Sequence, residues 1–240
     1  MKMNAEKFIK HVERARVGGL INEMVLDENL SFCVTDVPRM VLSVSNLGLG
    51  ESDCKPMGIY DLDLFTKTLA AAASNVFASN EELECTVVAN YLVFKKGANE
   101  LKFLLSNVDA ISSTISNLDD VLKQIQTVPA VEIPVNKKDL DVLITAINLY
   151  APESVTLSVD KGKVTVLVGI KTQHNWIVPL GKTKSKSSFS MKLHPTILTK
   201  LIQVLPYEEE ITMEIRKNMP IIFSSEMYTF ALNPFQEVEK

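Results

Sequence analysis

The sequence is poor in the residues that disulfides and metal sites need. It holds only three cysteines among 240 residues. Cys33, Cys54 and Cys85 are odd in number, far apart and in no CxxC spacing, so neither a disulfide framework nor a zinc site is expected. A reducing, cytoplasmic location suits such a chain.

Long hydrophobic runs are also absent. No apolar stretch approaches the roughly 20 residues of a membrane span, and the polar N-terminus has no apolar core typical of a signal peptide. We therefore expect no membrane association. The net charge of −4 argues against a protein whose whole surface coats nucleic acid, while a local basic face stays possible.

Motifs for catalysis are missing as well: there is no GxxxxGK[ST], HExxH or GxSxG. The histidines lie in different predicted elements (His11, His174 and His194). Asp61 and Asp63 resemble an acid–base pair only superficially, because Asp61 is better explained as a helix cap. The Glu208–Glu210 run is expected in a solvated turn. The sequence predicts no catalytic residue, no metal and no cofactor.

What the chain does contain is one cassette that recurs four times: a short apolar strand, a capped amphipathic helix and a run of strands. Three copies are clear, at Met57–Ala73, Val131–Tyr150 and Phe189–Leu205, while Met1–Arg16 has lost most of its leading strand. The helices are predicted to begin near residues 5, 62, 137 and 195. This spacing indicates two tandem halves with two cassettes each.

Periodicity and caps define the elements within each half. Asn4, Asp61 and Asn136 are predicted N-caps, and Pro195 is the first residue of the last helix. The runs with strand character are Leu20–Leu26, Leu30–Thr35, Met40–Ser45, Leu83–Ala89, Tyr91–Lys95, Glu100–Leu105, Val155–Val159, Lys163–Ile170, Trp176–Leu180, Phe189–Leu193, Ile211–Ile215, Pro220–Ser224 and Met227–Leu232. The expected fold is α+β, with two helices on antiparallel sheets in each domain.

The two expected domains are residues 1–107 and 130–240. Between them, residues 108–129 form a predicted linker with weak strand character. Loops of this length in compact proteins are usually functional or connecting segments. Its apolar residues predict that it packs against another part of the chain.

At three places the sequence itself resembles a known family. These are Ile59-Tyr60-Asp61-Leu62 followed by Phe65, the segment Val131–Ile170, and the pair Met219–Ile222 and Tyr228–Leu232. In their order and spacing these segments resemble the DNA polymerase sliding clamps, a family that includes proliferating cell nuclear antigen and the clamps of large tailed phages. The phage clamps are the more similar in length and in amino-acid sequence.

The resemblance implies a head-to-tail homotrimer that closes around duplex DNA without reading its sequence and tethers the replicative polymerase. The clamp loader would bind the same ring, in the host cytoplasm if the protein is viral. The implied subunit seam joins Leu101, Phe103 and Leu105 of one subunit to Trp176, Val178 and Leu180 of the next. The alternative is that both runs are ordinary interior strands, although Trp176 would then be costly exposed area.

The resemblance also implies that DNA faces the polar sides of the helices. The candidate contacts are Lys7, Lys10, Arg14, Lys67, Lys137, Lys138 and Lys200, and His11 is expected to share the polar side of the first helix. Non-specific phosphate contact of this kind suits a sliding ring. Reversing Lys10 and Arg14 to Glu should weaken DNA retention without loss of the trimer. The tract Lys182, Lys184 and Lys186 is interpreted as a surface loop, with DNA contact the less favoured alternative.

In the family, partners insert an apolar-aromatic peptide into a pocket beside the linker. The matching positions are Met40, Leu42, Leu118, Val121, Ile125, Pro220, Phe230, Leu232 and Pro234. An apolar groove suits an aromatic anchor. For Leu42, Phe230 and Leu232 a plain core role remains open.

Two further interpretations compete with the clamp. One is a β-rich structural oligomer, such as a scaffold or virion component, whose repeats serve packing alone. The weaker one is a small-molecule enzyme with an unrecognised site. Solution mass separates clamp from enzyme, and retention on circular against linear DNA separates clamp from scaffold.

Overall fold

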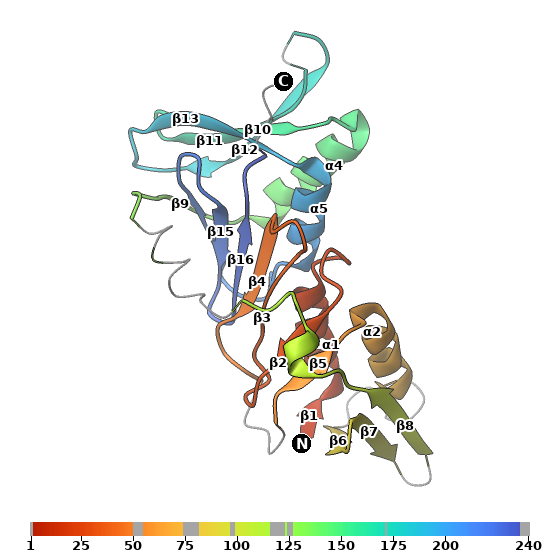
Figure 1. Cartoon of the computed structure of the whole chain (residues 1–240). Helices are drawn as coiled ribbons and strands as arrows, with labels where there is room; N and C mark the ends of the chain where they lie inside the picture. Colours follow the sequence, from red (N-terminus) through yellow and green to blue (C-terminus); the bar gives the residue numbers. More distant parts are fainter. Residues whose placement is uncertain are drawn as a thin grey trace. The chain divides into compact units, whose positions relative to one another are not determined.

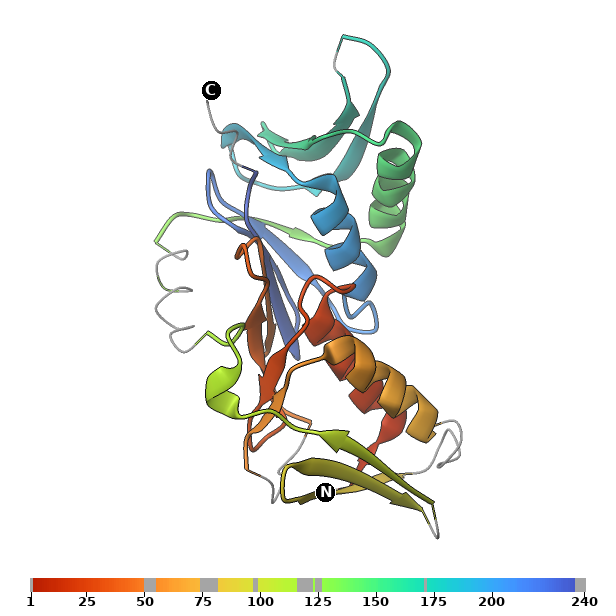
Figure 2. The same cartoon turned by 45° about the vertical axis from the view of Figure 1, so that its right-hand side comes forward.

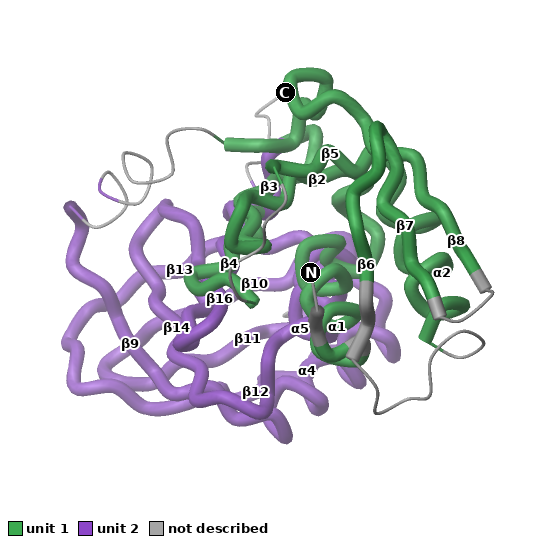
Figure 3. Tube along the Cα trace, turned by 90° about the horizontal axis from the view of Figure 1, so that it is seen from below, with its two compact units in different colours: residues 1–38, 42–116 green, residues 39–41, 117–240 purple. Residues whose placement is uncertain are grey.

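The computed structural model describes residues 2–49, 55–73, 82–96, 99–115, 123, 127–170 and 172–235. The chain divides into two compact units (Figure 3). Unit 1 holds residues 1–38 and 42–116, and unit 2 holds residues 39–41 and 117–240. The described start of the predicted linker, up to Ile115, thus lies in unit 1.

Unit 1 begins with a strand and a helix and continues through strands to a second helix (Figure 1). Its elements are β1 (Lys2–Asn4), α1 (Ala5–Arg16), β2 (Met24–Leu26), β3 (Cys33–Thr35), β4 (Val41–Ser45, whose first residue belongs to unit 2), β5 (Met57–Ile59), α2 (Leu62–Ala71), β6 (Glu82–Val88), β7 (Tyr91–Lys96), β8 (Asn99–Leu104) and the short 3-10 helix η2 (Val108–Ala110).

Unit 2 repeats the same order of strands and helices. Its elements are β9 (Val131–Pro134), α4 (Lys137–Tyr150), β10 (Val155–Asp160), β11 (Lys163–Gly169), β12 (Asn175–Lys182), β13 (Ser188–Leu193), α5 (Pro195–Val204), β14 (Thr212–Ile215), β15 (Ile221–Ser224) and β16 (Tyr228–Leu232). The observed helix starts confirm the four predicted from the cassette spacing.

The sheets of the two units follow one topology, and the strand pairs within each unit are antiparallel. In unit 1, β1-β6-β7-β8 form a four-stranded sheet, while β2 pairs with β5 and β3 pairs with β4. In unit 2 the strands pair in the order β9-β14-β15-β16, which corresponds to β1-β6-β7-β8 of unit 1. The strands β12-β11-β10-β13 form the other sheet, so β10 and β13 correspond to β2 and β5. The predicted tandem repeat is therefore confirmed.

Capping side chains start three of the four helices where the sequence predicts. Asn4 Oδ1 accepts from the Lys7 amide at 3.0 Å, Asp61 Oδ1 from Leu64 at 2.8 Å and Asn136 Oδ1 from Lys138 at 3.0 Å. Each bond satisfies an amide that has no partner within its helix. The fourth helix starts with Pro195, whose fixed φ suits the first turn.

Two predicted strands are shorter than their apolar runs. The run from Leu20 becomes strand only at Met24, because Val17 adopts a left-handed conformation and the Ile21 amide turns back to the Arg16 carbonyl. The run from Leu30 becomes strand only at Cys33, because Leu30, at φ 62°, belongs to a turn. In both places backbone closure, rather than apolar content, sets the strand start.

Each unit packs its two helices side by side against its sheets (Figure 2). In unit 1 the Phe65 ring of α2 lies 6.1 Å from the Phe8 ring of α1 and 4.8 Å from the Phe103 ring of β8. In unit 2 the corresponding core joins α4, α5 and both sheets; Leu143, Leu198, Val166 and Phe223 line one small common gap. Among the described residues, none of the helices is both long and apolar enough to cross a bilayer.

Candidate functional site

Each unit contains a four-stranded sheet, and one of the two edge strands of each sheet coincides with a run predicted as the seam. In unit 1 this strand is β8, which pairs with β7 on one side only, and in unit 2 it is β12, which pairs with β11 on one side only. An edge strand presents free backbone donors and acceptors to any matching strand. The two runs predicted as the seam are therefore edge strands, in the part of the chain that the structure describes.

Each of the two edge strands carries both buried and exposed apolar side chains. On β8, Phe103 is buried against Phe65, while Leu104 is 46% exposed. On β12, Val178 and Leu180 are buried, while Trp176 and Ile177 are 39% and 59% exposed. Of the six predicted seam residues, Leu101 and Leu105 are half-buried, so Trp176 is the one whose side chain is well exposed.

The basic residues predicted for DNA contact differ in their exposure and in whether they already pair with an acidic side chain. Lys10 pairs with Glu6 at 2.9 Å and Lys67 with Asp63 at 2.5 Å. Lys7 and Lys138 are exposed and form no ion pair with a described residue. In unit 2, Lys137 lies 5.5 Å from the Tyr207 ring centroid, a cation–π contact. Arg14 and Lys200 are half-buried.

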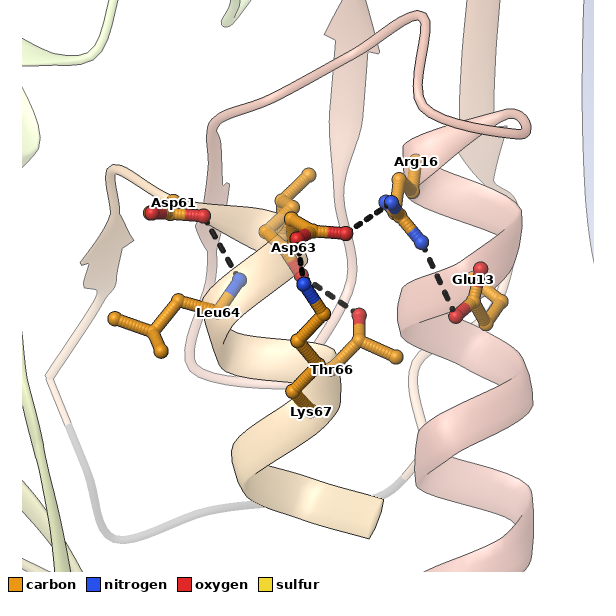
Figure 4. A network of polar contacts seen from close by, with 8 residues as sticks. Glu13, Arg16, Asp61, Asp63, Leu64, Thr66 and Lys67 are labelled. Carbon is orange, nitrogen blue, oxygen red and sulfur yellow. Dashed lines mark hydrogen bonds and ion pairs between the residues drawn. The ribbon is translucent and has the colours of Figure 1, made fainter.

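A polar network joins the two helices of unit 1 (Figure 4). Asp63, in the first turn of α2, accepts from Arg16 of α1 and from Lys67 one turn further on, and Arg16 also pairs with Glu13 at 3.5 Å. The Lys67 hydrogen bond, with the charges of Lys67 and Arg16, lowers the pKa of Asp63 below its ordinary value. Asp63 is thus ionised, and its ion pair with Arg16 links α2 to α1.

His11 does not share the polar side of α1, and that expectation is wrong. Its side chain is fully buried, with Nε2 2.6 Å from the Leu30 carbonyl oxygen and the ring 4.8 Å from the Phe32 ring. Burial lowers its pKa to about 4. A neutral imidazole in this position donates to Leu30 and holds the turn before β3 onto α1.

The residues predicted for the peptide pocket divide into exposed and core positions. Leu118, Val121 and Ile125 lie outside the described residues. Leu42 is buried in β4, and Phe230 and Leu232 are buried in β16, so the core role left open for these three matches their burial. Met40, Pro220 and Pro234 are half-buried, and the Met40 carbonyl accepts from the Asn233 amide at 2.9 Å.

One hollow of unit 1 contains no acid–base pair in its lining. This hollow, of about 330 Å³ in unit 1, lies beside β5 and the β6–β7 turn, and its polar lining consists of Lys55, Asn90, Ser106 and Asn107. No described group of three or more His, Cys, Asp or Glu residues could hold a metal ion. The Cys33 thiol is half-buried, and burial raises its pKa to about 11, which makes it a poor nucleophile.

Comparison with solved structures assigns the fold. PCNA from Thermococcus kodakaraensis matches with a TM-score of 0.71 and 16% identity over 96% of this chain and 97% of that chain. A. fulgidus PCNA, solved bound to the C-terminal region of FEN-1, matches with 0.71 and 17% over 99% and 98%. This chain has the sliding-clamp fold. No protein-family model matches the sequence, and a search of curated proteins finds no match.

A bacterial chain shows the same fold in a longer form. The DNA polymerase III beta chain from Streptococcus pneumoniae matches with a TM-score of 0.71 and 16% identity over 99% of this chain but 64% of that chain. The clamp-fold units of this chain thus correspond to part of the bacterial one.

Within this clamp fold, the sequence prediction named the exposed Trp176 but missed two other exposed apolar side chains of the edge strands. It named Phe103 and Val178, which face the core, rather than their exposed neighbours Leu104 and Ile177. For Leu104 the signal is the alternation of side chains along a strand. Lys102 must point to solvent, and Leu104 shares its face two residues on.

Proposed function

We propose that this chain is one subunit of a sliding clamp, a ring that encircles duplex DNA and tethers a polymerase. The observation that carries the proposal is the repeated topology of the two units, in which β8 and β12 are each an edge strand of a four-stranded sheet. A contact between two different surfaces of identical subunits makes a ring when the rotation closes. Pairing β8 with β12 of the next subunit would also cover one free edge of each of these sheets.

The exposed apolar side chains on these strands support the pairing. Leu104, Trp176 and Ile177 would otherwise leave large apolar area in water beside unsatisfied backbone groups. At about 25 cal/mol per Å² of buried apolar area, each such side chain adds on the order of 1 kcal/mol to the contact. In this proposal three copies close the ring.

DNA would be held by charge alone. The exposed lysines of the helices, Lys7 and Lys138 foremost, can contact phosphates without reading bases. Such contacts hold the ring on DNA while letting it move along the duplex. The clamp itself would carry out no chemistry.

Partners would bind as peptides. The A. fulgidus clamp was solved with the C-terminal region of FEN-1, which supports a similar mode of binding here. The half-buried Met40, Pro220 and Pro234 are the described candidates for contact with such a peptide. A polymerase and a clamp loader are the proposed partners.

The experiment that tests the ring is topological. The protein, loaded or allowed to close on nicked circular DNA, should stay bound at a salt concentration that removes it from the linear form of the same DNA. Blocking both ends of the linear form should restore retention. Equal loss from circular and linear DNA would instead favour a β-rich structural oligomer, the competing function, whose repeats serve packing only.

A further inference from the structure

One corner of the second unit collects positive charge that the helices do not account for. The turn between β10 and β11 and the loop between β12 and β13 lie at the same end of the sheet β12-β11-β10-β13 (Figure 1). They carry five lysines, all exposed: Lys161, Lys163, Lys182, Lys184 and Lys186. We call these residues the hairpin lysines.

Pairing of the strands brings the hairpin lysines together. Lys163 of β11 is the register partner of Lys182 of β12 and of Asp160 of β10. The Thr183 amide donates to the Gly162 carbonyl at 2.9 Å, which places the turn against the loop that carries Lys184 and Lys186. Lys161 and Gly162 both have positive φ, at 45° and 82°, as a tight two-residue hairpin requires.

Acidic side chains do not balance this corner. Asp160 is the one carboxylate in these two segments, and its Oδ1 accepts from the Ser188 hydroxyl at 3.0 Å. Among the described residues, none of the hairpin lysines forms an ion pair, whereas Lys10, Lys67, Lys95 and Lys102 all do. The corner thus has a net charge of +4 in a chain whose total is −4.

Two of these lysines lie directly opposite each other, and Asp160 is the one acidic register partner beside them. Like charges directly opposite each other on neighbouring strands repel, and Lys163 and Lys182 hold that position. Packing and turn formation do not require lysine at either place, since both side chains are exposed. A bound anionic polymer would offset the repulsion between these lysine side chains.

We propose that the hairpin lysines form a second DNA contact, separate from the helices, that binds the phosphate backbone of duplex DNA without regard to sequence. At 182–187 each lysine is followed by a threonine or a serine, so ammonium groups and hydroxyls are offered together and no aromatic or apolar anchor lies among them. Peptide partners bind through buried anchors, which this corner lacks. Regularly spaced phosphates need only charge and hydrogen-bond donors.

The test compares two double variants that remove the same charge. Lys184→Gln with Lys186→Gln changes the corner, and Lys55→Gln with Lys217→Gln changes two exposed lysines elsewhere. Binding of the full chain to a short blunt duplex is measured over a range of low salt concentrations. The corner variant should bind more weakly, and its log–log salt slope should fall by about 0.9 for each phosphate that it no longer binds. The control should keep the wild-type slope.

A variant that keeps the charge and an acidic polypeptide as an alternative ligand serve as further comparisons. Lys184→Arg with Lys186→Arg should restore binding, because the charge returns. Equal slopes for the corner variant and its control overturn the proposal. So does loss of binding to polyglutamate with unchanged DNA binding, which would assign the corner to an acidic peptide. Because short duplexes cannot trap a ring, this result is independent of the circular-DNA test of the proposed function.

Discussion

Arg16 of α1 donates to the carboxylate of Asp63 of α2, and Lys67 binds the other oxygen of that carboxylate at 2.5 Å. One acidic side chain therefore joins the last turn of one helix to the first turn of its neighbour (Figure 4). The same carboxylate keeps Lys67 paired, so the network has consequences for stability and for DNA contact.

Asp63→Asn should lower the melting temperature near neutral pH. The pKa of Asp63 is lowered in the folded chain, chiefly by Lys67, so its stabilisation is complete above its ordinary value of 3.8. That stabilisation is lost as pH falls through the lowered pKa. Thermal unfolding of both proteins should therefore converge in acid. Asp139→Asn, in the first turn of α4, is the control and should show no comparable convergence.

The buried His11 predicts a second loss of stability at low pH, caused here by protonation of a neutral base. Burial lowers its pKa from 6.5 to about 4, so the unfolded chain takes up a proton before the folded chain does. Stability is complete above pH 6.5 and falls between that value and about 4, by an amount on the order of 3 kcal/mol.

Denaturant unfolding over this pH range measures the effect. His11→Gln keeps a donor for the Leu30 carbonyl but cannot titrate, so its stability should vary less with pH. The matched control is His174→Gln at an exposed position, which should retain the wild-type pH dependence. An unchanged slope in His11→Gln contradicts the assignment.

Much of the fold followed from the sequence because its signals are local. Asn4, Asp61 and Asn136 sit directly before apolar residues at helical spacing, and each is the cap observed. The site was less predictable because it depends on which way each side chain faces and on which residues lie opposite each other in the folded chain. The helical spacing of His11 did not show that the Leu30 carbonyl lies within its reach. Strand parity, by contrast, could have separated Leu104 from Phe103.

The ion pairs of the helices predict unequal contributions to DNA binding. Lys7→Gln and Lys138→Gln should each weaken retention on circular DNA more than Lys10→Gln or Lys67→Gln. The reason is that Lys10 and Lys67 must leave Glu6 and Asp63 before they bind a phosphate. Salt dependence of retention measures this, because the slope falls by about 0.9 for each phosphate that a variant no longer binds. Equal effects of all four substitutions would show that these pairs do not matter.

The edge strand β12 should govern assembly. Ile177→Glu places a charge at a 59% exposed apolar position on this strand, so it should shift the protein from oligomer to monomer. Sedimentation analysis gives the mass, and circular dichroism shows whether the fold is kept. Leu149→Glu, at a 67% exposed position on α4, is the control and should leave the mass unchanged. A monomer shift in both variants, or in neither, contradicts the role of β12.

The peptide pocket needs variants that separate binding from folding. Phe230 is 1% exposed and its ring stacks on Tyr228 at 6.2 Å, so Phe230→Ala should cost about 3–5 kcal/mol of stability and says little about a pocket. Met40 is half-buried, and Met40→Gln should leave the melting temperature nearly unchanged. If Met40 contacts the peptide, calorimetry with a synthetic apolar-aromatic peptide should show weaker binding to Met40→Gln. Met227→Gln, also at a half-buried methionine of unit 2, should bind like the wild type. Equal affinities in the two variants would place the peptide away from Met40.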